Sequence, residues 1–339
     1  MIRRRMAVWL VAFAVAFCSL PAGAQTITPQ GRLTLTSGTP VMTGDVVGAT
    51  TIYYDCYAGN TVPVGATPTN LTIPSCETSM GLSSTNIASG SVYDVFAVSN
   101  SGALVICAGP AWSSTTTRGT GSGTTQIDQT NGGLWTNTNA LAHCYGGSAG
   151  TTDYGTVAAN AGTYLGSLYA TAAGQTTMQF APTPAGGGTA NILGLYNAHN
   201  RVPLRSVERD SHGNWSYGTD TWRPADNSTS NRITWLDGLG QSQVSASYAN
   251  SAWCSPCSAV PVIGVDFNSA TAIPGGIVGF ISVGSGNILE GAGGNTAILL
   301  GVNYAQAMEI VDGGTADFVG GQDNSSLGYA GALSLALAD

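Results

Sequence analysis

Glycine constrains the fold of this chain more than any other residue, because it occupies 47 of the 339 positions. That is about twice its usual share of ~7%. Each glycine inside an α-helix costs about 1 kcal/mol relative to alanine, so long amphipathic helices are excluded. Thr, Val, Ile and Tyr instead recur between Gly, Asn and Ser turn residues, which is typical of β-strands. The sequence therefore predicts an all-β protein with an antiparallel β-sandwich or jelly-roll architecture.

Strand-like runs follow one another along the whole chain. Residues 91–98 and 103–108 flank Ser99-Asn100-Ser101-Gly102, which predicts a β-hairpin. Further strands are predicted at 31–37, 49–57, 162–170, 175–180, 191–197, 214–217, 231–236, 243–248, 260–266, 277–283, 296–302 and 307–311. Residues 113–133, rich in Ser, Thr and Gly, indicate a long exposed loop or a functional surface loop.

The chain begins with the features of a Sec-type signal peptide. Arg3, Arg4 and Arg5 precede an apolar run from Met6 to Leu20, and Ala22-Gly23-Ala24 supplies a small-residue cleavage site. The apolar run is too short for a membrane span. We expect cleavage after Ala24 and a secreted, periplasmic or cell-surface protein with no membrane span after cleavage.

The Pro- and Gly-rich stretch at 181–190 is the best candidate for a domain boundary. The predicted organisation is a signal peptide at 1–24, an N-terminal β domain at 25–180, a linker at 181–190 and a C-terminal β domain at 191–339. A single extended sandwich is the alternative.

The charge pattern excludes several classes of partner. All ten basic residues are arginine, and the formal net charge is −8. Loss of the leader removes three arginines and no acid, so the mature chain is still more acidic. A surface that follows nucleic-acid phosphates is therefore excluded. Charged residues make up only 8% of the chain, against a usual ~25%. Such a polar but uncharged surface suits an exported β-protein or carbohydrate contact.

Six cysteines follow the leader, and an even number in an exported chain predicts three disulfides. Six cysteines allow 15 connectivities. Proximity in the sequence favours three particular pairs. The alternative is that some of the six cysteines are free and buried. The predicted pairs are Cys56–Cys76, Cys107–Cys144 and Cys254–Cys257.

Two short motifs match catalytic patterns but lack the required context. Trp253–Cys257, WCSPC, is similar to a thioredoxin active site, yet the flanking segments do not predict a strand before it and a helix after it. A turn closed by a local disulfide, or two cysteines with distant partners, fits better. Gly146–Gly150 fits G-x-S-x-G near His143, but a turn-rich segment follows instead of the helix of a nucleophile elbow.

We expect no metal or cofactor. His143, His199 and His212 are not spaced as zinc ligands, and Asp312–Asp317 lacks the spacing of a calcium loop. Residues 220–231 either form a polar loop beneath Trp222 or hold a calcium ion. Glycoside hydrolysis needs two paired carboxylates, and nothing in the sequence selects a pair. The available acids are Asp55, Glu77, Asp94, Glu208 and Asp210.

One stretch has the composition of a sugar-binding surface. Aromatic rings beside amides, acids and arginine can stack on and hydrogen-bond to a sugar. The predicted ligand-binding residues are Trp215, Tyr217, Trp222, Arg223 and Asp226. The alternative is that these aromatic residues belong to the core.

Several segments, in order, resemble phage and prophage structural proteins of the tail-fibre or receptor-binding type found in proteobacteria. They are GRLTLTSGTPVMTGDVVGATTIYYDCYAGN at 31–60, SVYDVFAVSNSGALVICAGPAW at 91–112, TRGTGSGTTQIDQTNGGLWTN at 117–137, GTYLGSLYAT at 162–171, YNAHNRVPL at 196–204, NWSYGTDTWRPADNSTSNRI at 214–233 and, more weakly, GVNYAQAMEI at 301–310. The resemblance implies a β-rich structural or recognition protein, with a homotrimer as the expected assembly. It transfers no site residues.

The leader and the cysteines depart from that family pattern. They suggest a prophage-derived protein recruited for export, or a bacterial surface protein built on the same fold. The sequence as a whole favours a non-catalytic protein that binds a cell-surface or extracellular glycan. The alternatives are a fibre-like homo-oligomer without a ligand and a secreted polysaccharide hydrolase.

Overall fold

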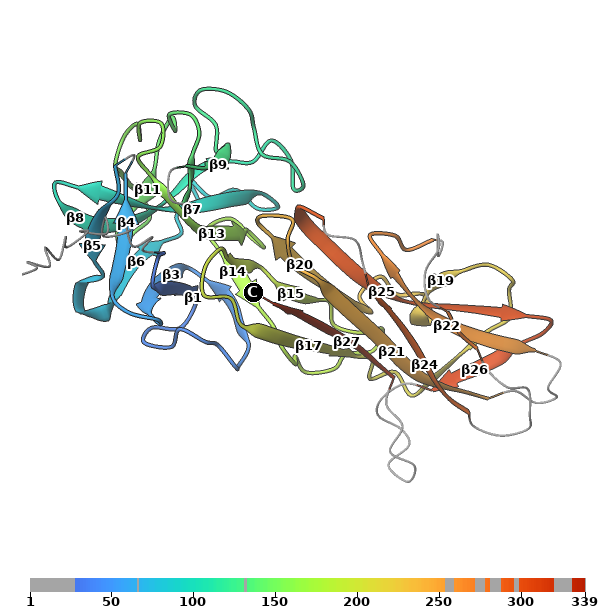
Figure 1. Ribbon diagram of the computed structural model, residues 1–339. Helices are drawn as coiled ribbons and strands as arrows, with labels where there is room; N and C mark the ends of the chain where they lie inside the picture. The colour runs from blue at the N-terminus through green and yellow to red at the C-terminus, as the bar shows by residue number, and fades with distance from the viewer. Residues whose placement is uncertain are drawn as a thin grey trace, which may run out of the picture.

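The chain is almost entirely β-strand (Figure 1). The computed structural model describes residues 28–65, 67–130, 133–253, 259–271, 278–280, 288–295, 299–319 and 331–338. The helical segments in these ranges are single 3₁₀ turns, η1 (Pro74–Cys76) and η2 (Ala225–Asn227). The all-β prediction is confirmed. None of the described helices is long and apolar enough to cross a membrane.

The first half of the chain forms the end of the molecule drawn in blue and cyan in Figure 1. A three-stranded sheet contains β1 (Gly31–Thr34), β3 (Thr51–Cys56) and β6 (Glu77–Gly81), beside the hairpin of β4 (Thr61–Val64) and β5 (Thr69–Thr72). An eight-stranded sheet follows the order β12 (Thr152–Asp153), β11 (Tyr145–Gly146), β8 (Ala103–Ala111), β7 (Val92–Asn100), β13 (Thr163–Tyr169), β10 (Trp135–Asn137) and β9 (Ile127–Gln129), with β16 (Leu195–Asn197) on β13.

The hairpin predicted around residues 99–102 joins β7 to β8. Ser101 and Gly102 adopt positive φ values of 52° and 87°, the backbone that a tight hairpin turn requires. The local sequence thus specifies this turn correctly.

Two further sheets pack face to face in the second half. One contains β2 (Val46–Ala49), β14 (Thr176–Met178), β15 (Asn191–Leu193), β20 (Arg232–Asp237), β25 (Gly301–Asp312), β22 (Val260–Phe267) and β23 (Val278–Phe280), with β19 (Arg223–Pro224) on β25. The other contains β17 (Pro203–Arg209), β27 (Ala332–Ala338), β21 (Val244–Trp253), β26 (Ala316–Val319) and β18 (Asn214–Tyr217), with β24 (Ile288–Asn295) on β21. The described strand pairs in these two sheets are antiparallel except for β15 with β20.

The strand β25 corrects one detail of the sequence prediction. Strands were expected at 296–302 and 307–311, but Gly301–Asp312 is one continuous strand. It pairs with β20 through Arg232↔Gln306 and with β22 through Asp266↔Gln306, so partners on both sides keep it extended.

The core crosses the predicted domain boundary at 181–190. One buried apolar cluster extends from Leu33 to Leu337. The strands β2 and β14 precede the boundary, yet they join the sheet that the second half builds. The two-domain division stays a prediction, and these strands tie the two halves together.

Two of the three predicted disulfides lie in the described residues, and both are confirmed. The Cα atoms are 5.0 Å apart in Cys56–Cys76 and 5.3 Å apart in Cys107–Cys144. The predicted Cys254–Cys257 pair and the predicted signal peptide lie outside the described residues.

Candidate functional site

The structure gathers four of the five predicted ligand-binding residues near one carboxylate, Glu309 on β25. The indole N–H of Trp215 donates to Glu309 Oε2 at 2.7 Å, and Arg223 Nε donates to Oε1 at 2.8 Å. The guanidinium of Arg223 lies 3.6 Å above the ring of Tyr217. Asp226 accepts a 2.7 Å contact from His212, whose ring stacks on Trp215. Trp222 is half-buried, and the described contacts of this cluster do not include it.

Two aromatic rings of this cluster, those of Trp215 and Tyr217, already contact other side chains of the protein. Trp215 is only 8% exposed and lies between His212 and Phe318. Arg223 covers one face of Tyr217, whose hydroxyl donates to the carbonyl of Thr221 at 2.6 Å. The burial of Trp215 fits the alternative that the aromatic residues belong to the core. Tyr217 and Trp222 are half-buried, and the sugar-binding role of this cluster stays a prediction.

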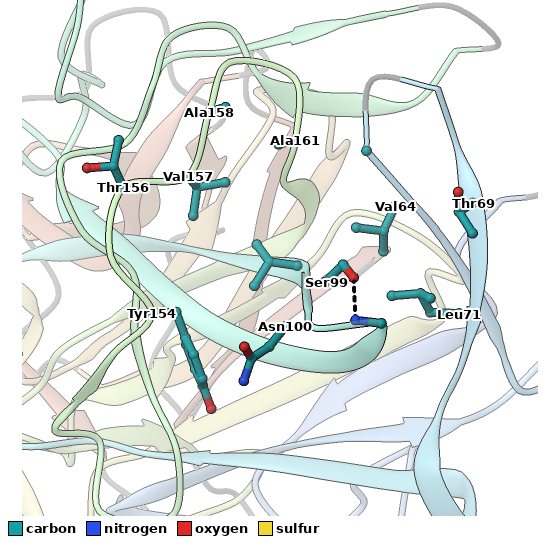
Figure 2. A pocket seen from close by; sticks show the side chains of 13 residues that line it. Val64, Thr69, Leu71, Ser99, Asn100, Tyr154, Thr156, Val157, Ala158 and Ala161 are labelled. Carbon is teal, nitrogen blue, oxygen red and sulfur yellow. Dashed lines mark hydrogen bonds between the residues drawn. The ribbon is translucent and has the colours of Figure 1, made fainter.

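A cavity of about 390 Å³ lies at the opposite end of the molecule, near β4, β5 and β8 in Figure 1, and Figure 2 shows its lining. Its walls come from the hairpin β4–β5, the tip of the hairpin β7–β8 and the loop at 154–161. Its volume falls within the range of about 300–1,000 Å³ that is typical of ligand sites. The lining residues are Val64, Gly65, Thr69, Leu71, Val98, Ser99, Asn100, Gly102, Tyr154, Thr156, Val157, Ala158 and Ala161.

The lining of this cavity combines apolar walls with a few uncharged polar groups. Tyr154 and Asn100 lie on one side in Figure 2, while Val64 and Leu71 of the hairpin β4–β5 lie on the other. None of the lining side chains carries a charge. Such a surface suits a neutral ligand that has both apolar C–H faces and hydroxyl groups.

Buried hydrogen bonds hold the loop at 154–161 in place. Asn137 is fully buried, and its Nδ2 donates to the carbonyl of Ala158 at 2.8 Å. Its Oδ1 accepts the N–H of Gly162 at 2.8 Å. The N–H of Tyr154 donates to the carbonyl of Cys144 at 3.0 Å, beside the Cys107–Cys144 disulfide. The loop is therefore pre-organised before any ligand arrives, which reduces the entropy cost of binding.

The opposite wall is attached to the same sheet. The Thr163 hydroxyl on β13 donates to the carbonyl of Pro63 on β4 at 2.6 Å, in the protein interior. Because β13 also pairs with β7, a single strand connects two walls of the cavity. Sequence reasoning missed this site because Val, Ala and Thr occur throughout β-proteins and form no binding motif. Only the packing of the β4–β5 hairpin, the β7–β8 hairpin and the loop at 154–161 brings them together.

The acids considered for hydrolysis fall into three separate places. Asp55 lies opposite Glu77 on neighbouring strands, and Asp94 forms an ion pair with Arg118. Glu208 and Asp210 lie beneath the segment predicted as a linker, where the N–H groups of Thr189 and Gly187 donate to them at 3.1 and 2.8 Å. Burial raises the pKa of Glu208 to about 8. None of these acids lines the cavity.

The G-x-S-x-G match shows no catalytic arrangement, and the cysteines of WCSPC lie outside the described residues. Gly146–Gly150 begins at the last residue of β11 and leads to β12, so a second strand follows it where a nucleophile elbow has a helix. Within the part of the chain that the structure describes, no three His, Cys, Asp or Glu side chains are grouped to hold a metal.

No protein-family model, curated protein or solved structure matches the chain. The similarity to phage tail-fibre proteins stays a prediction.

Proposed function

We propose that this protein is an exported, non-catalytic recognition protein that binds an uncharged glycan of a cell surface or extracellular material. The observation that carries the proposal is the 390 Å³ cavity with its charge-free lining and pre-organised loop. The ring of Tyr154 would stack on the apolar face of a sugar, and Asn100 and Thr69 would hydrogen-bond to its hydroxyls.

The charge of the protein supports a neutral ligand. The chain is acidic and contains no lysine, so an anionic polysaccharide would be repelled on approach. No cation in the lining compensates for this repulsion.

The two disulfides support a location outside the cytosol. Disulfides persist in secreted and periplasmic proteins and are rare in the cytosol. Together with the predicted leader at residues 1–24 they suit export, and a tail-fibre-like origin with a trimeric assembly belongs to the same proposal.

The test is binding of the purified, oxidised chain to a panel of neutral and acidic polysaccharides. We expect saturable binding to one neutral class and no release of reducing ends. Tyr154→Ala should weaken binding by about ten-fold, since a lost aromatic contact and its buried area are worth about 1.4 kcal/mol or more. The matched control is Tyr57→Ala, which removes a tyrosine that is 47% exposed and outside the cavity.

If Tyr154→Ala and Tyr57→Ala weaken binding equally, the loss is not specific to the cavity. The ligand would then bind at another site, or both variants would be partly unfolded. Binding that is unaffected by Tyr154→Ala and Asn100→Ala would overturn the site. Release of reducing ends would favour the hydrolase alternative.

A further inference from the structure

The two described disulfides differ in their exposure to solvent. Cys107 and Cys144 are both 0% exposed, in a buried cluster with Phe96. Cys76, in contrast, is exposed, and Cys56 is half-buried. Thiol–disulfide exchange begins when a thiolate reaches one of the two sulfur atoms, so access limits its rate. An incoming thiol therefore has a route to Cys56–Cys76, while burial shields Cys107–Cys144 as long as the protein is folded.

The backbone at Cys76 also sets this disulfide apart. Ser75 and Cys76 have φ values of 49° and 63°, in the left-handed region that favours glycine. Other residues keep such a backbone only where surrounding contacts impose it. The bond to Cys56 lies one register position beyond Asp55↔Glu77, the last pair of β3 with β6, so it holds η1 against the end of this ladder. Breaking the bond removes one of the contacts that impose the strained backbone.

The same disulfide closes the loop that carries one wall of the cavity. The hairpin β4–β5 forms a two-stranded sheet of its own, and it lies wholly between the two cysteines, which are 20 residues apart. Its second strand, β5, contributes Thr69 and Leu71 to the lining of the cavity. The position of these two residues therefore depends on what holds β5 in place.

The two strands of this hairpin are held unequally. On β4, Val62 and Val64 are buried. The hydroxyl of Thr163 also donates to the carbonyl of Pro63 at 2.6 Å. On β5, three of the four residues are exposed, and the described strand pairing is with β4 alone. The buried side chain of Ile73 and the disulfide follow directly after β5. Loss of the disulfide should therefore loosen β5 more than β4.

We propose that Cys56–Cys76 is a redox switch: a dithiol outside the cytosol reduces it while Cys107–Cys144 stays intact, and strand β5 then loosens from the wall of the cavity. Exposed disulfides are the labile and regulatory ones, whereas buried structural disulfides resist reduction. The switch depends on exposure and on the contacts of β5. Only its effect on glycan binding rests on the proposed function.

The exchange consists of two attacks by the same dithiol. Its first thiolate attacks Sγ of Cys76, which forms a mixed disulfide and breaks the bond to Cys56. Cys56 leaves as a thiolate and takes up a proton. The second thiolate of the dithiol then attacks the mixed disulfide at the sulfur of the dithiol, which releases Cys76 to take up the other proton. Two electrons pass to the protein, and the dithiol is oxidised to a disulfide.

The experiment treats the folded, oxidised chain with graded dithiothreitol near neutral pH and then blocks free thiols with an alkylating agent. Peptide mapping by mass spectrometry assigns each label to one cysteine. We expect Cys56 and Cys76 to be labelled at least about ten-fold faster than Cys107 and Cys144. Amide hydrogen exchange on the same samples should become faster in β5 and stay unchanged in β7 and β8. Chain treated with oxidised dithiothreitol is the control.

The double variant Cys56→Ser/Cys76→Ser removes the bond without a reductant. It should show fast exchange in β5 from the start, and dithiothreitol should not increase it further. If this variant does not fold, wild type that is alkylated after partial reduction gives the same comparison. Equal labelling rates for the four cysteines would overturn the proposal, and so would fast labelling of Cys56 and Cys76 with unchanged exchange in β5.

The ligand provides a separate readout. A glycan that binds the oxidised chain should bind more weakly after selective reduction of Cys56–Cys76. If β5 loosens as expected but no glycan binds either form, the redox switch stands and the proposed function fails. If a glycan binds both forms equally although β5 loosens, the switch does not control the cavity, and the proposal is wrong.

Discussion

The indole N–H of Trp215 donates to Oε2 of Glu309 over 2.7 Å, and this bond joins the two sheets of the second half. Trp215 belongs to β18 and Glu309 to β25, which lie in opposite sheets. Burial raises the pKa of Glu309 to about 7, while Arg223 and Trp215 favour its charged form. The sandwich is thus joined through a buried carboxylate whose charge depends on one arginine.

Removing that arginine should destabilise the protein in a pH-dependent manner. Arg223→Gln leaves Glu309, which is 0% exposed, without an opposite charge. Breaking a buried pair in this way costs about 3–5 kcal/mol. We expect a loss of this size at pH 8 and a smaller loss at pH 5, where the carboxyl group is protonated. Urea unfolding at both pH values measures it.

The control for this variant is Arg205→Gln, which removes an exposed arginine of β17. It should change stability by no more than about 0.5 kcal/mol. Equal losses for Arg223→Gln at pH 5 and pH 8 would contradict the role of the Glu309 charge.

Glu208 should make the protein more stable in mild acid than in mild alkali. Its pKa is about 8 in the folded state and 4.5 without the fold, so between these values the folded state binds more protons. Stability therefore falls as pH rises through this window, by up to about 1.4 kcal/mol per pH unit for one group. Denaturant unfolding from pH 4.5 to 8.5 follows the change.

The matched variant for this prediction is Glu208→Gln, whose amide imitates the protonated acid. It should flatten the pH dependence and be at least as stable as wild type at pH 8. Asp55 and Glu309 have raised pKa values of the same sign, so part of the slope should persist. An unchanged slope would show that Glu208 is already ionised in the folded protein.

The Cys107–Cys144 disulfide should support both stability and ligand binding. It spans 37 residues, and the chain-entropy relation gives about 4 kcal/mol for such a loop. The double variant Cys107→Ser/Cys144→Ser should lose about this much stability. It should also bind the proposed glycan more weakly, because the carbonyl of Cys144 holds the N–H of Tyr154. Unfolding curves and binding isotherms measure the two effects.

Ile263→Ala provides a control of similar stability loss. Ile263 is fully buried in the other half of the molecule, and its truncation should cost about 2–5 kcal/mol. Binding should be retained at temperatures where this variant is folded. If both variants lose binding equally, the disulfide has no specific effect on the cavity.

Arg118 should fix the loop that begins at residue 113. It donates to both oxygens of the fully buried Asp94, at 2.7 and 2.9 Å, and to the carbonyl of Gly238 at 2.6 Å. Lysine cannot reproduce this forked geometry. Arg118→Lys should cost about 1.5–3 kcal/mol and speed amide exchange in the loop, measured by hydrogen exchange. Unchanged exchange would mean that other contacts hold the loop.

The fold class was predictable because its signals are local. The high glycine content, the alternation of apolar and polar residues in strands, and the turn residues Ser99–Gly102 can each be recognised from a few neighbouring residues. The pairs Cys56–Cys76 and Cys107–Cys144 followed from short sequence separation, since a shorter loop is easier to close. The long strand β25 was divided in the prediction because its continuity comes from β20 and β22.

The sites were less predictable because they depend on distant contacts. Trp215 matched a sugar-binding pattern, but its burial is set by Phe318 and Glu309, about a hundred residues away. Glu208 did carry a signal, since Leu204, Ser206 and Glu208 alternate toward the interior of β17. An acid in the inward register of a strand indicates a buried charge. The cavity at Tyr154 had no comparable signal.

Each disulfide fastens one wall of the cavity. Cys56–Cys76 encloses the hairpin β4–β5 with Val64 and Leu71, and Cys107–Cys144 anchors the loop of Tyr154. Without these covalent links the two walls would keep only their hydrogen bonds, such as those from Asn137 to Ala158 and from Thr163 to Pro63. For the proposed exported binding protein, the cavity would therefore reach its final geometry only after the four cysteines are oxidised.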